Sequence, residues 1–275
     1  NLGNTFLQIG KLDDAVKSYE KTLTLRPDYA KAHNNLGIVF QRLGQLDAAV
    51  KSLKEAITIK PDYDKAHNNL GNVFKELAQP DDAIKCYEKA LAINPDYAEA
   101  HNNLGVMLKE LGQLEDAVKC YEKALTLKPD YTEAHNNLGN AFKELDQPAA
   151  AVKFYEKALA VNPDYAEAYY NLTIAYNKLG LAFKKLGQLD DAVKCYEKAL
   201  AINPDHTEAH NNIGIAYVYN GLGAAMHSLG QLDAAVKCYK NALAIKPDYA
   251  DAYANRGNVL KDLKRLDEAL ASYES

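Results

Sequence analysis

The sequence predicts an all-α fold, an α-solenoid built from stacked antiparallel helix pairs. Apolar residues recur at helical spacing along the chain, and seven of the nine prolines precede an aspartate. Successive Pro-Asp pairs are 34, 34, 34, 34, 41 and 43 residues apart: Pro27, Pro61, Pro95, Pro129, Pro163, Pro204 and Pro247. A period of 34 is the length of a helix–turn–helix unit that buries its apolar face only by stacking on copies of itself. The 275 residues are therefore expected to form one array and not two globular domains.

The unit at 98–131 shows how each pair is expected to form. In its first segment, Ala100, Leu104 and Leu111 fall at helical spacing, and Gly112 then ends the helix. In its second segment, an apolar stripe runs from Leu114 to Leu127 and ends before Pro129. Small residues in both helices allow close approach, and the recurrent tyrosines of the second helix are expected in the core: Tyr87, Tyr121, Tyr155 and Tyr196.

Eight units follow when the count restarts after each Pro-Asp-Tyr or Pro-Asp-His: 1–29, 30–63, 64–97, 98–131, 132–165, 166–206, 207–249 and 250–275. Asn1 begins inside a helix and Ser275 ends inside one. Terminal repeats normally carry polar caps. We therefore expect the chain to be a piece of a longer array.

Two long units predict irregular joints near 173–186 and 214–230. In 166–206, seven extra residues are nearly two helical turns, so one long helix would keep the same face. In 207–249, nine extra residues would rotate the face by about half a turn, and Asn220-Gly221 predicts a break. Because Leu179-Gly180 and Leu222-Gly223 restart the first-helix pattern, loss of residues from two adjacent units is the alternative to insertion.

Charge and composition exclude several classes of partner. The net charge is −5, which lacks the electrostatic attraction that nucleic-acid binding needs. No apolar run approaches the roughly 18–20 residues that cross a bilayer. We expect a cytoplasmic protein without nucleic-acid or membrane partners.

No catalytic, cofactor or metal site is predicted. The cysteines Cys86, Cys120, Cys195 and Cys238 occupy one equivalent position, so neighbours lie about a helix diameter apart, roughly 10 Å. Disulfides need Cα atoms within about 7 Å, so reduced thiols are expected. Five of the seven histidines recur once per repeat with the same separation, and none has metal-ligand spacing to another ligand.

The unit pattern resembles the tetratricopeptide (TPR) family. The resemblance is carried in 98–131 by Leu104, Gly105, Ala117, Tyr121, Ala124 and Pro129. His stands at 33, 67, 101, 135 and 210 where the family often has Trp. The His-Asn-Asn-Leu-Gly motif resembles most the TPR arrays of O-GlcNAc transferases and their bacterial relatives. This resemblance implies a right-handed superhelix whose concave groove is lined by the first helix of each unit.

Asparagine occupies one first-helix position in all eight units: Asn1, Asn35, Asn69, Asn103, Asn137, Asn171, Asn212 and Asn255. Asn costs up to about 0.7 kcal/mol relative to Ala in a helix, so another interaction should compensate. Because an amide both donates and accepts, this column predicts binding to the backbone of an extended peptide. Neighbours are expected to add specificity: Asn34, Asn68, Asn102, Asn136, Asn211, Lys75, Lys109 and Lys143. In the alternative interpretation, the amides bond between adjacent helices or were simply copied by duplication.

The leading functional hypothesis is a non-catalytic scaffold that binds extended peptide segments, as the substrate-recruiting region of an O-GlcNAc-transferase-like protein. One alternative is a chaperone adaptor that clamps a C-terminal carboxylate. Such clamps carry Lys or Arg where this chain has Asn34 and Asn35, which disfavours that alternative. Another alternative is a structural scaffold that self-associates end to end.

Overall fold

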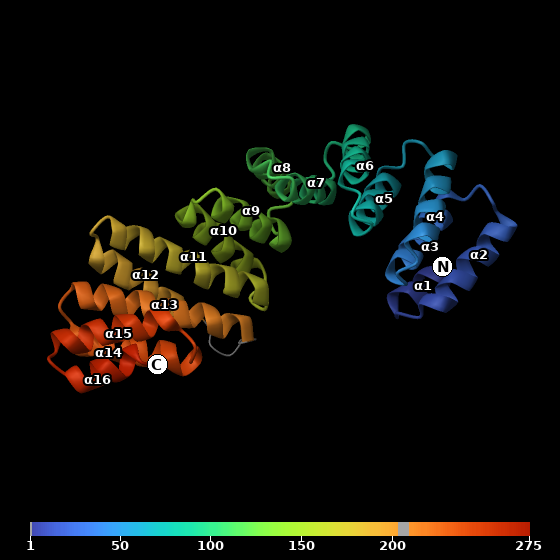
Figure 1. The fold of residues 1–275 in the computed structure, drawn as a ribbon. Coiled ribbons are helices and arrows are strands. Elements are labelled where there is room, and N and C mark those ends of the chain that lie inside the picture. The colour runs from blue at the N-terminus through green and yellow to red at the C-terminus, as the bar shows by residue number, and fades with distance from the viewer. Residues whose placement is uncertain (1, 203–208) are drawn as a thin grey trace. The chain divides into compact units, whose positions relative to one another are not determined.

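The computed structural model describes residues 2–202 and 209–275, in which every regular element is a helix (Figure 1). Sixteen helices lie in these two ranges: α1 Leu2–Gln8, α2 Leu12–Leu25, α3 Ala30–Arg42, α4 Leu46–Ile59, α5 Asp64–Glu76, α6 Pro80–Ile93, α7 Ala98–Glu110, α8 Leu114–Leu127, α9 Thr132–Glu144, α10 Pro148–Val161, α11 Ala166–Lys185, α12 Leu189–Ala201, α13 Ala209–Ser228, α14 Leu232–Ile245, α15 Ala250–Asp262 and α16 Leu266–Tyr273. The side chains of 209–214 are also outside the description.

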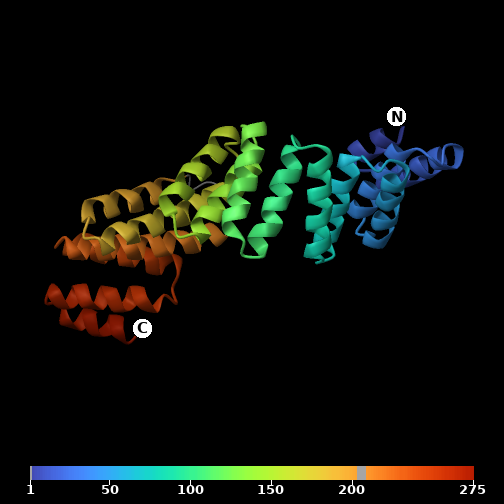
Figure 2. The same cartoon turned by 90° about the horizontal axis from the view of Figure 1, so that it is seen from above.

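The helices pack into two compact units, 1–134 and 135–275. Within the first unit each helix from α1 to α8 contacts the next, and the first helices α3, α5 and α7 also contact one another. Figure 2 shows these pairs standing in a row. Within the second unit α10 to α16 pack in the same way, and α11, α13 and α15 are in contact. The predicted α-solenoid of stacked antiparallel pairs is confirmed.

Seven of the eight pairs are closed by a tyrosine ring that lies against a glycine, and in the α3–α4 pair Leu53 lies against Gly37 instead. A Cβ atom added to Gly71 would lie 2.6 Å from Cε1 of Tyr87, so only glycine allows α5 and α6 this close. The Tyr87 ring is fully buried. The same contact, with the same sequence separation, recurs in Gly3–Tyr19, Gly105–Tyr121, Gly139–Tyr155, Gly180–Tyr196, Gly223–Tyr239 and Gly257–Tyr273. The predicted core position of the tyrosines is confirmed.

A residue with left-handed backbone ends the first helix of every pair. Five are glycines with φ between 70° and 76°: Gly10, Gly44, Gly112, Gly187 and Gly230. The other three are Ala78 and Asp146, both at φ 55°, and Lys264 at φ 61°. The predicted role of Gly112 is confirmed, and three units keep its geometry with a side chain that does not favour it.

The two irregular units contain continuous helices of 20 residues, α11 and α13. The break predicted at Asn220-Gly221 is wrong. A Cβ on Gly221 would lie 2.8 Å from Cε1 of Tyr196, so the glycine serves a close approach between α13 and α12. Asn220 donates from Nδ2 to the Tyr249 hydroxyl (3.2 Å) and accepts at Oδ1 from Asn255 (3.1 Å). Contacts with neighbouring helices therefore override the local turn preference of the pair.

The second half of each long helix takes the packing register of an ordinary first helix. Gly180 faces Tyr196 and Gly223 faces Tyr239, with the same sequence separation as Gly71 and Tyr87. Loss of residues predicts a loop or gap at 177–181 and 218–223, but both segments are helical. The continuous helices favour the insertion interpretation, although the boundary between units at 206 and 207 lies outside the described residues.

Replacing Ala78 by glycine is expected to stabilise the protein. Left-handed backbone costs a residue with a Cβ about 1 kcal/mol, and glycine removes that cost. The Ala78→Gly variant should therefore unfold in urea with a free energy about 0.5–1 kcal/mol higher. Ala254→Gly is the matched control, because Ala254 is exposed in the interior of α15 and should lose about 1 kcal/mol. Equal losses in both variants would contradict the strain at Ala78.

Candidate functional site

Asparagine side chains link the first helices of successive pairs. Nδ2 of Asn69 donates to Oδ1 of Asn34 at 2.9 Å, and Nδ2 of Asn103 donates to Oδ1 of Asn68 at 3.0 Å. In the second unit, Asn171 donates to Asn136 and Asn255 donates to Asn220, both at 3.1 Å. Every bond joins residues that are 35 apart. We call these eight residues the asparagine ladder.

Three of the four acceptors of the ladder are interior residues: Asn34, Asn68 and Asn136 are 4%, 4% and 1% exposed. The fourth acceptor, Asn220, is half-buried, and Asn102, at the equivalent position outside the ladder, is 5% exposed. Burying an amide is costly unless it is hydrogen-bonded, and the ladder supplies that bond to Asn34, Asn68 and Asn136. Their role as specificity contacts stays a prediction, and side chains this buried present almost no surface to a peptide. Asn211 lies outside the described side chains.

The asparagines of the predicted column lie nearer the surface. Asn35, Asn69, Asn103, Asn137 and Asn255 are half-buried, Asn171 is buried, and Asn1 and Asn212 lie outside the described residues. Asn103 donates to Oδ1 of Asn72 (3.1 Å) as well as to Asn68. Within the described part of the chain, Oδ1 of Asn69 and Oδ1 of Asn103 accept no hydrogen bond. The ladder therefore fixes these amides and leaves an acceptor on each.

The predicted lysines differ in how they relate to the column. Lys143 donates to Oδ1 of Asn171 (3.2 Å), and the partner of that amide, Asn136, donates to Oε1 of Glu167 (2.9 Å). Lys75 stands at the same sequence separation from Asn103, yet it is exposed and makes no such bond. Lys109 is half-buried. A lysine and an incoming N–H can therefore compete for the same amide oxygen.

A second set of asparagines supports the tyrosine hydroxyls. The residue after the packing glycine accepts from the tyrosine of the same pair: Tyr19 to Asn4 (2.6 Å), Tyr87 to Asn72 (2.8 Å), Tyr155 to Asn140 (2.8 Å) and Tyr273 to Asn258 (2.8 Å). Sequence reasoning missed these residues, although Asn directly after the glycine was the signal. At the equivalent position before Tyr196 stands Leu181, and the buried Tyr196 hydroxyl has no hydrogen-bond partner among the described residues.

Tyrosines of the turns bond to asparagines of the first helices. Burial raises the pKa of Tyr131 to about 12, although its hydrogen bond with Asn102 acts in the opposite direction. Burial likewise raises the pKa of Tyr249, which bonds Asn220, to about 12. Both hydroxyls therefore stay protonated at neutral pH and add no charge beside these amides.

The histidine column holds the turns between units. Nε2 lies 2.9 Å from the Pro27 carbonyl oxygen in His33, 3.0 Å from Pro61 in His67 and 2.9 Å from Pro95 in His101. A carbonyl oxygen only accepts, so Nε2 carries the proton in each ring. Within the described ranges, no group of three His, Cys, Asp or Glu residues could hold a metal ion. These histidines are structural.

The four cysteines are free thiols. Burial raises the pKa of Cys86 and of Cys120 to about 11, with nearby Asp82 and Asp116 acting in the same direction. The thiolate is the reactive species, so these groups are poor nucleophiles at neutral pH.

The chain matches TPR sequence families along most of its length. The family described as TPR repeat matches 3–44, 42–77, 105–146, 180–221 and 223–264. Families described as tetratricopeptide repeat match 64–97 and 132–165, and 86–119 and 154–194. The fold and the ladder define a helical-repeat protein. The chain belongs to the tetratricopeptide repeat family. The matches from 180 and 223 begin at the packing glycines inside α11 and α13.

Solved structures agree with this fold, whereas no curated protein matches the chain. The C-terminal part of a TPR repeat-containing protein from Cytophaga hutchinsonii superposes with a TM-score of 0.74 at 16% identity, over 92% of this chain and 97% of that one. A crystal structure of MamA gives 0.53 at 27% identity, over 61% and 98%. YrrB, described as a TPR protein with an unusual peptide-binding site, gives 0.57 at 20%, over 74% and 96%.

This fold is typical of non-catalytic protein-interaction scaffolds, and the family membership supports that class for this chain. No helix in the described ranges is both long and apolar enough to cross a bilayer.

Removing a tyrosine hydroxyl is expected to have opposite effects in two neighbouring pairs. Tyr155→Phe breaks the bond to Asn140 and should lower the free energy of unfolding by about 1 kcal/mol. Tyr196→Phe removes a buried hydroxyl for which the described part of the chain offers no partner, so it should be neutral or stabilising by up to about 1 kcal/mol. Both rings are fully buried, so the changes in the free energy of unfolding in urea can be compared directly. A larger loss for Tyr196→Phe would refute the assignment.

Thiol modification is expected to report the raised pKa values. In a variant that retains only Cys120, a disulfide reagent at pH 8 should react about tenfold more slowly with folded protein than with urea-unfolded protein. The fall in thiolate fraction outweighs the greater intrinsic nucleophilicity of the more basic thiolate. The rate should still rise between pH 8 and pH 10, and a plateau below pH 9 would contradict a pKa of about 11.

Proposed function

We propose that this chain is a scaffold that binds extended peptide segments along its first helices, at the asparagine column. We further propose that it recruits substrates for an O-GlcNAc-transferase-like protein in the cytoplasm. The observation that carries the proposal is the pair of oxygens, Oδ1 of Asn69 and Oδ1 of Asn103, which accept no hydrogen bond on amides whose N–H groups the ladder holds.

The ladder prepares these amides for binding. A free asparagine side chain loses rotational freedom when it binds a ligand, and this loss weakens the affinity. In Asn103 two N–H donations, to Asn68 and Asn72, already fix the amide plane. An extended peptide presents backbone N–H groups at regular intervals whatever its sequence. Repeated fixed acceptors therefore suit a scaffold that accepts many clients.

Specificity would come from charge near the column. Lys75 is exposed and has no hydrogen-bond or ion-pair partner among the described residues. It is therefore available to pair with an acidic side chain of the client. Lys143, by contrast, already bonds Asn171, and a client would have to displace it. Peptides that bind with an acidic residue near Asn103 should be favoured.

The family resemblance supports the wider role. The His-Asn-Asn-Leu-Gly motif recurs as it does in O-GlcNAc-transferase arrays, and YrrB, with a TM-score of 0.57, is described as having a peptide-binding site. The free thiols fit a reducing compartment such as the cytoplasm.

Backbone recognition has a direct test. Random unstructured 12-residue peptides on an array should bind the wild-type chain, and N-methylation of alternate backbone amides should weaken binding more than a scrambled sequence does. Replacing Asn69, Asn103 and Asn137 by Ala should lower affinity at least tenfold, because the two open acceptors on Asn69 and Asn103 are removed. Asn162→Ala, on an exposed turn, is the control and should bind normally.

Circular dichroism and urea unfolding of the triple variant check that the helices remain. Affinity unchanged in a folded triple variant, or indifference to N-methylation, would refute the proposal.

End-to-end self-association is the second candidate, and the exposed apolar side chains of α16 favour it. Leu266, Leu270 and Tyr273 are 65%, 58% and 49% exposed. Sedimentation at rising concentration distinguishes the two candidates, because a peptide-binding monomer keeps a constant mass.

A further inference from the structure

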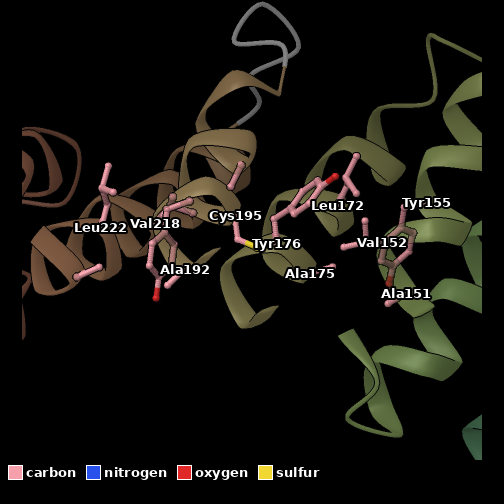
Figure 3. Close-up of a cluster of buried hydrophobic side chains, with 13 residues drawn as sticks. Ala151, Val152, Tyr155, Leu172, Ala175, Tyr176, Ala192, Cys195, Val218 and Leu222 are labelled. Atoms are coloured by element: carbon pink, nitrogen blue, oxygen red, sulfur yellow. The ribbon is translucent and has the colours of Figure 1, made fainter. Parts of the chain in front are cut away.

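A cavity of about 410 Å³ lies in the second unit between α10, α11 and α12. Its apolar lining includes Val152, Leu179, Phe183 and Cys195, and the side of the Tyr176 ring completes it. Figure 3 shows Tyr176 of α11 lying between Val152 of α10 and Cys195 of α12. We call this cavity the α11 pocket. It contains no residue of the asparagine ladder, so an inference about it does not depend on the proposed function.

The extra residues of α11 build this pocket. Tyr176 belongs to the half of α11 that continues the register of Leu172, whereas Leu179 and Phe183 belong to the half that packs against Tyr196. An ordinary first helix, such as α7, has 13 residues and not 20. The lining of the pocket therefore combines side chains from two packing registers, and only a long helix contains both. Its volume falls in the range of about 300–1,000 Å³ that is typical of ligand sites.

The rim of the pocket carries more positive than negative charge. Asp191 is paired with Lys194 at 3.2 Å, and Glu156 accepts a hydrogen bond from the Tyr176 hydroxyl at 2.6 Å. Within the described ranges, the partner of Lys198 is the Tyr176 ring, 5.5 Å from its Nζ. Lys153 is exposed and has no ion pair among the described residues. Two lysines, one on α10 and one on α12, thus lack a carboxylate in a chain whose net charge is −5.

We infer that the α11 pocket binds a short acidic peptide segment that inserts one Leu- or Phe-sized side chain. The apolar side chain packs on Leu179, Phe183 and the Tyr176 ring, where it loses contact with water. Carboxylates on either side of this anchor pair with Lys153 and Lys198. The aromatic and aliphatic lining of the pocket suits the apolar anchor. The positively charged lysines at its rim suit the flanking carboxylates. A basic or wholly polar segment would satisfy neither part.

Charge exchange tests the pocket. The probe is a fluorescein-labelled acetylated peptide with one central Phe flanked by two Glu on each side, followed by fluorescence anisotropy. The double variant Lys153→Glu and Lys198→Glu should weaken binding at least tenfold. A partner peptide with Lys in place of each Glu should bind this variant better than it binds wild type, which a misfolded pocket could not produce.

Matched controls locate the site. Lys157→Glu, on the same helix α10 but outside the pocket lining, should leave affinity unchanged. The Asn69, Asn103 and Asn137 alanine variant should also bind this peptide normally, so failure here and failure of peptide binding at the column are distinguishable. In a variant that retains only Cys195, the peptide should slow maleimide modification, because that thiol lines the pocket.

Three outcomes would overturn the inference. They are equal affinity of wild type and the double variant, loss of affinity in Lys157→Glu alone, and lack of thiol protection at saturating peptide. Competition by octanoate at the same concentration as the peptide would show that the pocket takes a fatty carboxylate, and this too would refute the peptide assignment.

Discussion

The contact between a tyrosine ring and a glycine underlies both the packing and the candidate site. Because a Cβ on Gly71 would overlap the Tyr87 ring, the ring and the glycine together set the distance between α5 and α6. Full burial of that ring then obliges its hydroxyl to find an acceptor, which is Oδ1 of Asn72. The same oxygen accepts from Asn103 of the next first helix. Asn72, the acceptor that the buried Tyr87 hydroxyl requires, thus also links its pair to the neighbouring pair.

The ladder explains how a solenoid tolerates polar residues in the interface between its units. Each buried acceptor asparagine would cost about 1–3 kcal/mol if its amide were unsatisfied. For Asn34, Asn68 and Asn136 the partner lies 35 residues further along the chain, where the next unit repeats the same pattern. The compensation that the poor helix propensity of Asn calls for therefore comes first from neighbouring helices. In Asn69 and Asn103 that compensation uses the N–H groups and leaves the oxygens.

The sequence predicted the features that depend on a single unit. It was less successful for features that depend on contacts between helices far apart in the sequence. The 34-residue period, Gly112 as a helix end and Tyr87 as a core residue all follow from local patterns. Bonds between adjacent helices were one of the alternatives for the asparagines, and the structure shows them. The sequence did not choose between the alternatives, because a residue on the flank of an apolar stripe can face either solvent or the next helix. Asn220-Gly221 misled for the same reason: its turn preference is weaker than its contacts with Tyr196, Tyr249 and Asn255.

The irregular unit would change what the array recognises if both proposed sites bind peptides. Identical units present identical groups, so a column of amides repeats one interaction and distinguishes clients poorly. The 20-residue helix α11 breaks this equivalence, because it brings Tyr176 of one register and Phe183 of the next into one cavity below Lys153 and Lys198. No triplet of helices of ordinary length can combine two registers in this way. Binding at the column and binding at the α11 pocket would then be complementary, since the first depends on backbone and the second on side chains. A client that carries both an extended stretch and an acidic apolar motif would be held at two points, and its affinity would gain from the high effective concentration of the second contact.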